Sequence, residues 1–317
     1  MSDRCKVALK KVLDEIGNPS AVHHEGRRVR GLIETAREQI ALAIDAEPEN
    51  ITFTSGASES SALLLRDNQI SCAKIEHPCV SAWCNQMLKI DQRGMVQIDD
   101  FGNSTVQLAN SETGIIQNIS GGLYMSDVVQ AIGKIDFSFR KSDLKSAVLS
   151  AHKIGGPTGV GAVVTDPKLQ FNPQIKGGGQ EMGRRSGTEN ILAIVGFGAA
   201  MEAIKEFLDD GEWEYIRELR DYLECELLNM NANIAIVGKK VDRLPNTSYF
   251  ATPGWASENQ VIQMDLAGFA ISAGSACSSG KVSKSKILEE MGYDEEYAQS
   301  GIRVSLPMTT KKKDIEL

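Results

Sequence analysis

Apolar residues recur along this chain with two periods, and the period changes from segment to segment. In residues 26–46 they recur every three or four positions and form one stripe, which predicts an amphipathic helix. Residues 2–16 show a similar helical spacing. Residues 190–229 are almost wholly helical in pattern, with a break near 209–211. The chain therefore contains long helices both near its start and in its second half.

Short apolar runs between these helices predict β-strands. They are found at residues 51–54, 70–75, 95–98, 105–108, 122–125, 147–149 and 161–164. Helices are expected at residues 57–65 and from Pro78 onward, because Pro suits the first turn of a helix. Strands that alternate with helices indicate an α/β fold with a parallel sheet, which carries ligand chemistry at the carboxyl ends of its strands.

The last third of the chain shows a second, shorter series of elements. Strands are expected at residues 234–237, 247–250 and 269–272, with a helix at 257–266. This pattern predicts a smaller α/β domain. We place a large domain at residues 17–205 and a small domain at 206–317, and we leave open whether residues 1–16 contribute to the small one.

Composition and charge narrow the class of protein. The 317 residues suit about two domains of roughly 150 residues. An excess of 42 Asp and Glu over 34 Lys and Arg argues against a nucleic-acid or membrane-surface binder. No apolar run approaches the ~18 residues of a membrane span, and the first residues are too polar for a secretory signal. We therefore expect a cytoplasmic location.

The cysteines predict neither a disulfide scaffold nor a metal site. Six cysteines over this length are too sparse for a disulfide framework. Cys72, Cys79 and Cys84 lie seven and five positions apart, and no pair has the two-residue separation of a structural zinc site. We expect no metal.

Two residues are candidate nucleophiles. Lys153 follows a buried-looking strand and precedes a glycine-rich turn, where a lysine facing a cleft can form a Schiff base. Taken alone, it is more simply an exposed lysine beside a turn. Cys277 lies among Gly and Ser residues, a setting that suits an accessible thiolate. A lone cysteine, however, is usually inert.

Other charged residues are candidates for ligand recognition. Arg185 and Arg303 could bind a carboxylate or phosphate through two parallel hydrogen bonds, although each alone is better explained as a surface ion pair. His77, at a helix start, could stack on a flat cofactor or transfer protons. Asp127, after a strand, could hold a protonated ring nitrogen. Helix capping is the simpler explanation for both.

A series of short motifs links these candidates in order along the chain. The motifs are Gly17-Asn18-Pro19-Ser20, residues 53–60, Glu76-His77-Pro78, Asn110-Ser111-Glu112-Thr113-Gly114, residues 150–159, residues 177–181, Arg185-Ser186-Gly187-Thr188, Leu244-Pro245-Asn246-Thr247 and residues 274–280. Each is only modestly specific. In this order and spacing, the set closely resembles the cysteine desulfurases, which are pyridoxal-phosphate enzymes of the class V aminotransferase family.

The resemblance implies a homodimer of fold type I, with a mainly parallel central sheet and pyridoxal 5'-phosphate as cofactor. Lys153 matches the lysine that binds the cofactor covalently. Asp127 matches the carboxylate that keeps the ring nitrogen protonated, and His77 matches the histidine that stacks on the ring and transfers protons. The other positions implied to bind the cofactor are Ala57, Ser58, Ser111, Gln130, Ser150, His152 and, from the other subunit, Thr188.

The resemblance also implies a substrate, a reaction and partners. Arg303 and Asn18 match substrate-binding positions, and Arg303 would bind the substrate carboxylate. Sulfur would leave L-cysteine for Cys277, giving L-alanine and a persulfide on Cys277. The sulfur would then pass to an iron–sulfur scaffold protein or to a tRNA-thiolation relay.

The chain departs from the family pattern in several places. The strand motif that usually precedes Gly17 is absent, and Ser111, Met125 and Met182 replace an Asn, a His and an Arg. Residues 114–126 are too few for the usual crossover helix, so part of a sheet face should be thinly covered. Two alternatives therefore stay open, a selenocysteine lyase and a reduced, weakly active or non-catalytic member that acts through a partner.

Overall fold

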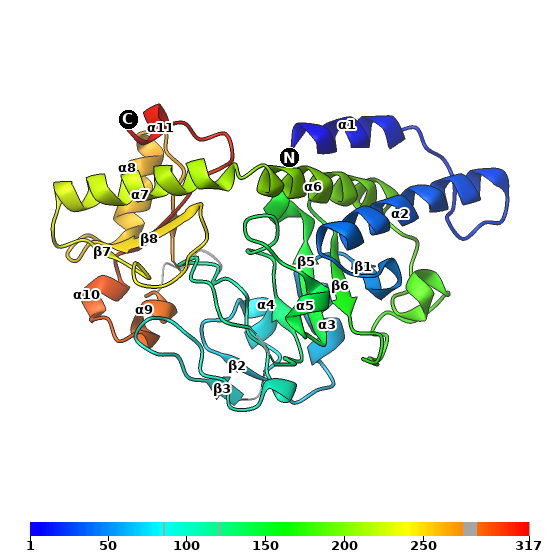
Figure 1. Ribbon diagram of the computed structural model, residues 1–317, viewed down its shortest axis with the longest axis horizontal. Coiled ribbons are helices and arrows are strands. Elements are labelled where there is room, and N and C mark those ends of the chain that lie inside the picture. The colour runs from blue at the N-terminus through cyan, green and yellow to red at the C-terminus, as the bar shows by residue number, and fades with distance from the viewer. Residues whose placement is uncertain (85, 120, 275–283, 317) are drawn as a thin grey trace.

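The computed structural model describes residues 1–317 except 85, 120, 275–283 and 317, and it contains two main sheets (Figure 1). The larger sheet has the order β1 (Ile51–Thr54), β6 (Gly161–Thr165), β5 (Ser146–Ser150) and β4 (Ser126–Asp127). Parallel bridges Thr105–Met125 and Ser71–Ser104 extend it to β2 (Ser71–Ala73), which pairs in parallel with β3 (Gln86–Leu88). Strand β6 runs antiparallel to β1 and β5. The mainly parallel sheet is therefore confirmed, with β6 as the antiparallel strand.

Helices cover both faces of this sheet because its strand residues are apolar on both sides. Leu149 and Val164 belong to one hydrophobic cluster, whereas their neighbours Val148 and Val163 belong to another. The first cluster lies under α2 (His24–Ala43) and α6 (Ile191–Asp209), and α1 (Asp3–Val12) packs on α6. The second includes Leu64 of α3 (Ala57–Leu65), which packs against α4 (Pro78–Ser81). The sheet is thus buried between two helical layers.

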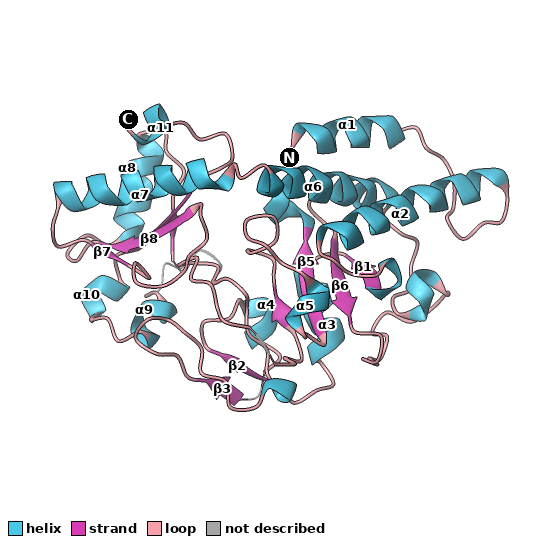
Figure 2. Cartoon of the chain, viewed as in Figure 1, coloured by secondary structure: helices cyan, strands magenta, loops and turns pink. Residues whose placement is uncertain are grey.

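The smaller sheet is antiparallel and lies beside the larger one (Figure 2). Its order is β7 (Ala235–Ile236), β8 (Thr247–Ala251), β10 (Gly301–Ser305) and β9 (Ser272–Ala273). The helices of this part are α7 (Trp213–Met230), α8 (Ser257–Leu266), α9 (Lys286–Glu290), α10 (Glu295–Ala298) and α11 (Lys312–Ile315). Trp213 Nε1 donates to Gly133 O at 2.5 Å, so the start of α7 is tied to the larger part.

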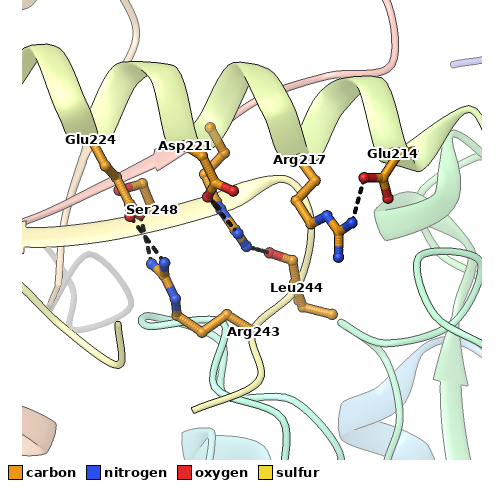
Figure 3. A network of polar contacts seen from close by, with 8 residues as sticks. Glu214, Arg217, Asp221, Glu224, Arg243, Leu244 and Ser248 are labelled. Carbon is orange, nitrogen blue, oxygen red and sulfur yellow. Dashed lines mark hydrogen bonds and ion pairs between the residues drawn. The ribbon is translucent and has the colours of Figure 1, made fainter. Parts of the chain in front are cut away.

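A buried ion pair and a buried hydrogen bond fasten α7 to the loop before β8 (Figure 3). Arg243 donates to the two carboxylate oxygens of Glu224 at 2.6 and 3.0 Å, and Ser248 Oγ donates to Glu224 Oε1 at 2.8 Å. Arg220 Nη1 donates to Leu244 O at 2.8 Å. Because the side chains of Arg243 and Glu224 are each 5% exposed, this pair joins helix and sheet inside the protein.

Most predicted elements are present, and the differences have local causes. The helix predicted at 257–266 is α8, and the break near 209–211 separates α6 from α7. The strand predicted at 95–98 is reduced to one bridge between Val96 and Ile90, and on the other edge of this segment the Val96 N–H donates to Gln117 Oε1. The strand predicted at 122–125 begins only at Ser126. The helix that begins at Pro78 lasts a single turn.

The short crossover before β4 contains no helix among its described residues, as its length predicts. A cavity of about 570 Å³ lies there, lined by Ile119 of the crossover, by Leu108 and by parts of α2 and α6. The turn α5 (Phe139–Ser142) borders it. Within the described part of the chain, no helix combines the length and apolarity needed to cross a membrane.

Candidate active site

A cavity of about 720 Å³ opens where the carboxyl ends of the large-sheet strands face the small sheet. Asp127 reaches it from β4, Lys153 from the turn after β5, and Arg303 from β10. Most of the residues predicted for the site line it, namely Ala57, Ser58, His77, Ser111, Asp127, Gln130, Ser150, His152, Lys153 and Arg303. The fold thus brings together residues that lie far apart in the sequence.

Lys153 is presented by a short 3₁₀ helix, Ala151–Ile154, that follows β5 directly. Gly155 ends this helix with φ of +79°, a backbone conformation that favours glycine. The N–H of Ser2, which caps α1, donates to Gly155 O at 2.8 Å. The turn that carries Lys153 is therefore held by the N-terminal helix as well as by the sheet.

One end of the cavity is suited to an anion. Helix α3 begins there, and its N-cap, Gly56, offers no side chain to its first N–H groups. Ser58, Ser150 and His152 line the same end, and Ser150 Oγ lies 2.8 Å from His152 Nδ1. Free helical N–H groups beside hydroxyl groups are a favourable setting for a phosphate.

Arg185 lies beside this anion-binding end but is already paired. Its Nε donates to Glu59 Oε1 at 2.8 Å, and the Ser55 N–H donates to Glu59 Oε2 at 2.7 Å. Burial alone would raise the pKa of Glu59, but the hydrogen bonds from Arg185 and Ser55 lower it. The ion pair that the sequence allowed for Arg185 is therefore the one observed, and it orders the segment just after β1.

Asp127 carries a carboxylate in a buried setting. The N–H of Val129 donates to its Oδ1 at 2.9 Å. Burial raises the pKa of Asp127 to about 6, and the Val129 hydrogen bond and the charge of Lys153 moderate the rise. Because a buried carboxylate is stabilised by a cationic partner, this group suits a protonated ring nitrogen.

His77 caps α4 and faces the cavity at the same time. The Cys79 N–H donates to His77 Nδ1 at 3.2 Å, so in the neutral ring the proton is on Nε2. Burial lowers the pKa of His77, and the charge of Lys153 lowers it further. In this tautomer the ring offers its Nε2–H as a hydrogen-bond donor, and it can take up a proton only at Nδ1, in place of the hydrogen bond from Cys79.

Glu76, the neighbour of His77, was not predicted as a site residue. It is 5% exposed, and the Gln107 N–H donates to its Oε1 at 2.7 Å. Its Oε2 is buried without a hydrogen-bond partner in the described part of the chain. Burial raises the pKa of Glu76 well above its usual range. The Glu-His pair was visible in the sequence, but only the fold shows that the carboxyl group is buried.

Arg303 presents an incompletely bonded guanidinium to the cavity. Its Nη1 donates to Ser111 O at 2.7 Å and its Nη2 to Ser272 Oγ at 3.4 Å. Its Nε is buried and has no hydrogen-bond partner among the described residues. Arg303 lines the cavity, and its binding of a substrate carboxylate stays a prediction.

Two of the predicted residues lie outside the lining of this cavity, and a third lies outside the described residues. Asn18 is exposed, accepts from the Ser20 N–H at 2.9 Å, and lines a separate pocket beside the start of α2. Thr188 is exposed and lies outside the cavity lining. Cys277 lies outside the described residues, and Gly274 and Lys284 on either side of it line the cavity.

The chain is similar to known proteins along nearly its whole length. The family model described as Aminotransferase class-V matches residues 5–317. A cysteine desulfurase IscS of Dictyoglomus turgidum is 35% identical, over 97% of this chain and 87% of that protein. A cysteine desulfurase of Gluconacetobacter diazotrophicus is 34% identical, over 96% of this chain and 84% of that protein. The solved NifS-like protein of Rickettsia africae has a TM-score of 0.89 and 32% identity, covering 100% of this chain and 93% of that one.

Proposed function

Because the chain belongs to the class-V aminotransferase family and is a pyridoxal-phosphate-dependent cysteine desulfurase, we propose that Lys153, Asp127, His77, Arg303 and Cys277 carry its reaction. The enzyme acts on L-cysteine and passes sulfur to an acceptor as a persulfide. The observation that carries the assignment is that Lys153, Asp127 and Arg303, from three different elements, line one cavity.

The cavity fits the cofactor at three points. The open N-terminus of α3, with Ser58, would hold the phosphate. The buried Asp127 would hold the ring nitrogen in its protonated form, and Lys153 would bind the cofactor covalently. His77 would stack on the ring. When bound, pyridoxal phosphate withdraws electrons from the attached substrate, which eases loss of the Cα proton and cleavage of the C–S bond.

The protein residues then have separate tasks. Arg303 binds the substrate carboxylate and so orients L-cysteine in the cavity. The amine of Lys153 would take the proton from the substrate Cα and return it there before L-alanine leaves. His77 would take up a proton at Nδ1, in place of the hydrogen bond that caps α4, and would then release one from Nε2.

Cys277 would receive the sulfur. Its thiolate attacks the sulfur of the substrate, an S–S bond forms, and the substrate C–S bond breaks. The electron pair of that bond stays on the carbon, which takes up a proton to become the methyl group of L-alanine. Gly274 and Lys284, which flank the segment that contains Cys277, line the cavity, and this supports the assignment.

Further parts of the proposal concern the assembly. We propose that two copies form a dimer in which Thr188 of one subunit contacts the phosphate of the other, and that Asn18 contributes to substrate binding. The exposure of Thr188 in the single chain supports the first part. We place the boundary between the large and small domains at residues 205 and 206, between the two sheets. The acceptor is proposed to be an iron–sulfur scaffold or tRNA-thiolation protein in the cytoplasm.

Alanine release from L-cysteine tests the proposal, with added pyridoxal phosphate and a thiol reductant. Wild type should release alanine and retain the absorbance of bound cofactor. Lys153→Ala should lose both. Cys277→Ala should keep the cofactor absorbance but stop persulfide formation and alanine release.

Two matched variants serve as controls. Lys168→Ala removes an exposed lysine, and Cys225→Ala removes an exposed cysteine of α7, so both should behave as wild type. Persulfide formation that persists in Cys277→Ala would show that another group receives the sulfur. Covalent cofactor in Lys153→Ala would show that another lysine binds it.

A further inference from the structure

Glu112 is a carboxylate of the cavity that the proposed mechanism does not use. It follows Ser111 directly and lines the same cavity as Arg303. Ser285 Oγ donates to Glu112 Oε2 at 3.1 Å, and the Tyr249 hydroxyl donates to the same atom at 3.4 Å. Tyr249 is 0% exposed, so this part of the network is inside the protein.

Groups from several elements surround this carboxylate. Tyr249 comes from β8, Arg303 from β10, and Ser285 and Lys286 from the start of α9. The charges of Arg303 and Lys286 both act on Glu112. A Cβ atom added to Gly274 would lie 2.6 Å from Glu112 Oε2, so the chain before residue 275 also closes against it. Glu112 therefore has a fixed place beside the guanidinium.

Arg303 lines the same cavity as this carboxylate, and its charge acts on Glu112. One of its nitrogens is bonded to Ser111 O, while its buried Nε has no acceptor among the described residues. A guanidinium stays charged at any ordinary pH. A negative charge on Glu112 stabilises that cation, but it also repels a second carboxylate brought to it.

We propose that Glu112 is a positioning residue whose charge state sets how strongly Arg303 binds the α-carboxylate of an amino acid. This inference rests on the proposed function of Arg303. When Glu112 is neutral, Arg303 attracts the substrate carboxylate with its full positive charge. When Glu112 is ionised, its negative charge offsets part of that attraction. Substrate binding and proton uptake by Glu112 are therefore linked.

The linkage falls in the neutral pH range. Burial raises the pKa of Glu112 to about 7, although hydrogen bonds from Ser285 and Tyr249 and the charge of Arg303 oppose the rise. A substrate carboxylate beside it raises the pKa further, by roughly one unit or more for a like charge in one site. Affinity is then highest below pH 7 and falls as the pH rises through both values. If substrate binding raises the pKa of Glu112 by one unit, the affinity for substrate falls roughly tenfold across this pH range.

The test is the dissociation constant of L-alanine from the holoenzyme, followed by the change in cofactor absorbance between pH 6 and pH 9. L-alanine has the carboxylate of the substrate but no thiol to titrate. Glu112→Gln stands for the neutral acid. At each pH the dissociation constant of wild type is divided by that of Glu112→Gln. Because titration of the ligand and of the cofactor affects both proteins alike, it cancels in this ratio. We expect the ratio to rise from about 1 at pH 6 to about 10 at pH 9.

Other variants make the result specific. Glu112→Asp keeps the charge and should keep the pH dependence of wild type. Tyr249→Phe removes one hydrogen-bond donor to the Glu112 carboxylate, so the midpoint of the pH-dependent loss of alanine affinity should move to higher pH. This variant also tests the inference if Glu112→Gln does not fold. Glu224→Gln changes a buried carboxylate of the same part, outside the cavity lining (Figure 3), and its ratio should not vary with pH.

The outcomes separate this inference from the function on which it rests. A ratio that stays flat for Glu112→Gln, while Arg303→Lys and Arg303→Gln weaken alanine binding, overturns the role of Glu112 alone. If the two Arg303 variants bind alanine as wild type does, Arg303 is not the carboxylate site and both ideas fail. A rising ratio, together with weak binding by the Arg303 variants, supports both.

Discussion

Removing the carboxylate of Glu181 should destabilise the protein more than removing an exposed carboxylate does. Glu181 is 6% exposed and Arg37 is 5% exposed. Arg37 donates to Glu181 Oε1 and Oε2 at 2.8 and 2.9 Å, and the Phe53 N–H donates to Oε2 at 2.7 Å. Burial alone would lower the pKa of Arg37, but the hydrogen bonds and charge of Glu181 raise it. The pair joins α2, the edge strand β1 and the turn that leads to Thr188.

The size of the effect follows from what each variant leaves behind. Glu181→Ala leaves a buried guanidinium without this partner, which costs about 3–5 kcal/mol in the free energy of unfolding. It also leaves the Phe53 N–H without its acceptor, a further 1–3 kcal/mol or so, although the two terms overlap. Glu181→Gln keeps an acceptor for Phe53, so we expect it to cost about 1–2 kcal/mol less than Glu181→Ala.

Urea unfolding, followed by circular dichroism at pH 7, measures these differences. Glu202→Ala is the control, because Glu202 pairs with Arg4 at 3.5 Å while both side chains are nearly half exposed, and such pairs contribute about 1 kcal/mol or less. The double variant Arg37→Met with Glu181→Leu should recover the part of the loss that comes from the unpaired charge, although the Phe53 N–H and Ile51 O stay without these partners. A Glu181→Ala protein as stable as Glu202→Ala, or a double variant no better than the single one, would refute the reasoning.

Three further predictions concern single sites. Because burial raises the pKa of Glu76 in the folded state, the contribution of its protonated form to stability is lost as pH rises from the unfolded pKa through the raised folded one. Glu76→Gln should flatten this fall in the Tm of the apoprotein, and an unchanged slope would contradict this. Asp127→Asn should weaken cofactor binding roughly tenfold or more in a titration of the apoprotein, because the ring nitrogen loses its counter-charge, and equal affinity would be inconsistent with the assigned role. Gly161→Ala would place a Cβ 2.6 Å from Leu149 O, so it should lower the free energy of unfolding in urea by about 1–3 kcal/mol. Gly31→Ala is the control, because its Cβ would have nothing within 4 Å, and it should be neutral or stabilising. Equal effects of the two variants would rule out the clash.

The fold was predictable where local periodicity and chain length decide the structure. The two long helices α6 and α7 have apolar stripes, and the break between them coincides with Gly211, which adopts φ of +74°. The direction of β6 was not predictable, since an apolar run such as residues 161–164 reads the same for a parallel or an antiparallel neighbour. At residues 95–98 only one bridge forms, and on the other edge the side chain of Gln117 takes the place of a neighbouring strand, which no local pattern indicates.

The candidate site was predictable mainly through the order of its motifs. Lys153, Asp127 and His77 were each ambiguous alone, and the fold places all three at one cavity. Glu76 and Glu112 were missed because a carboxylate in a loop is usually solvated. Their burial depends on strands and helices from other parts of the chain, which the local sequence does not contain.

The place of β6 in the large sheet also sets the order in which the chain can fold during synthesis. Ile51 of β1 pairs with Val164, and Thr54 pairs with Gly161, so β1 waits for more than a hundred later residues. At about 5–20 residues per second, that wait lasts on the order of ten seconds. Helix α6, which packs on α2, is made later still. The apolar faces of α2 and β1 are thus uncovered for much of translation, and nascent chains that stop before α6 are expected to aggregate or to bind chaperones.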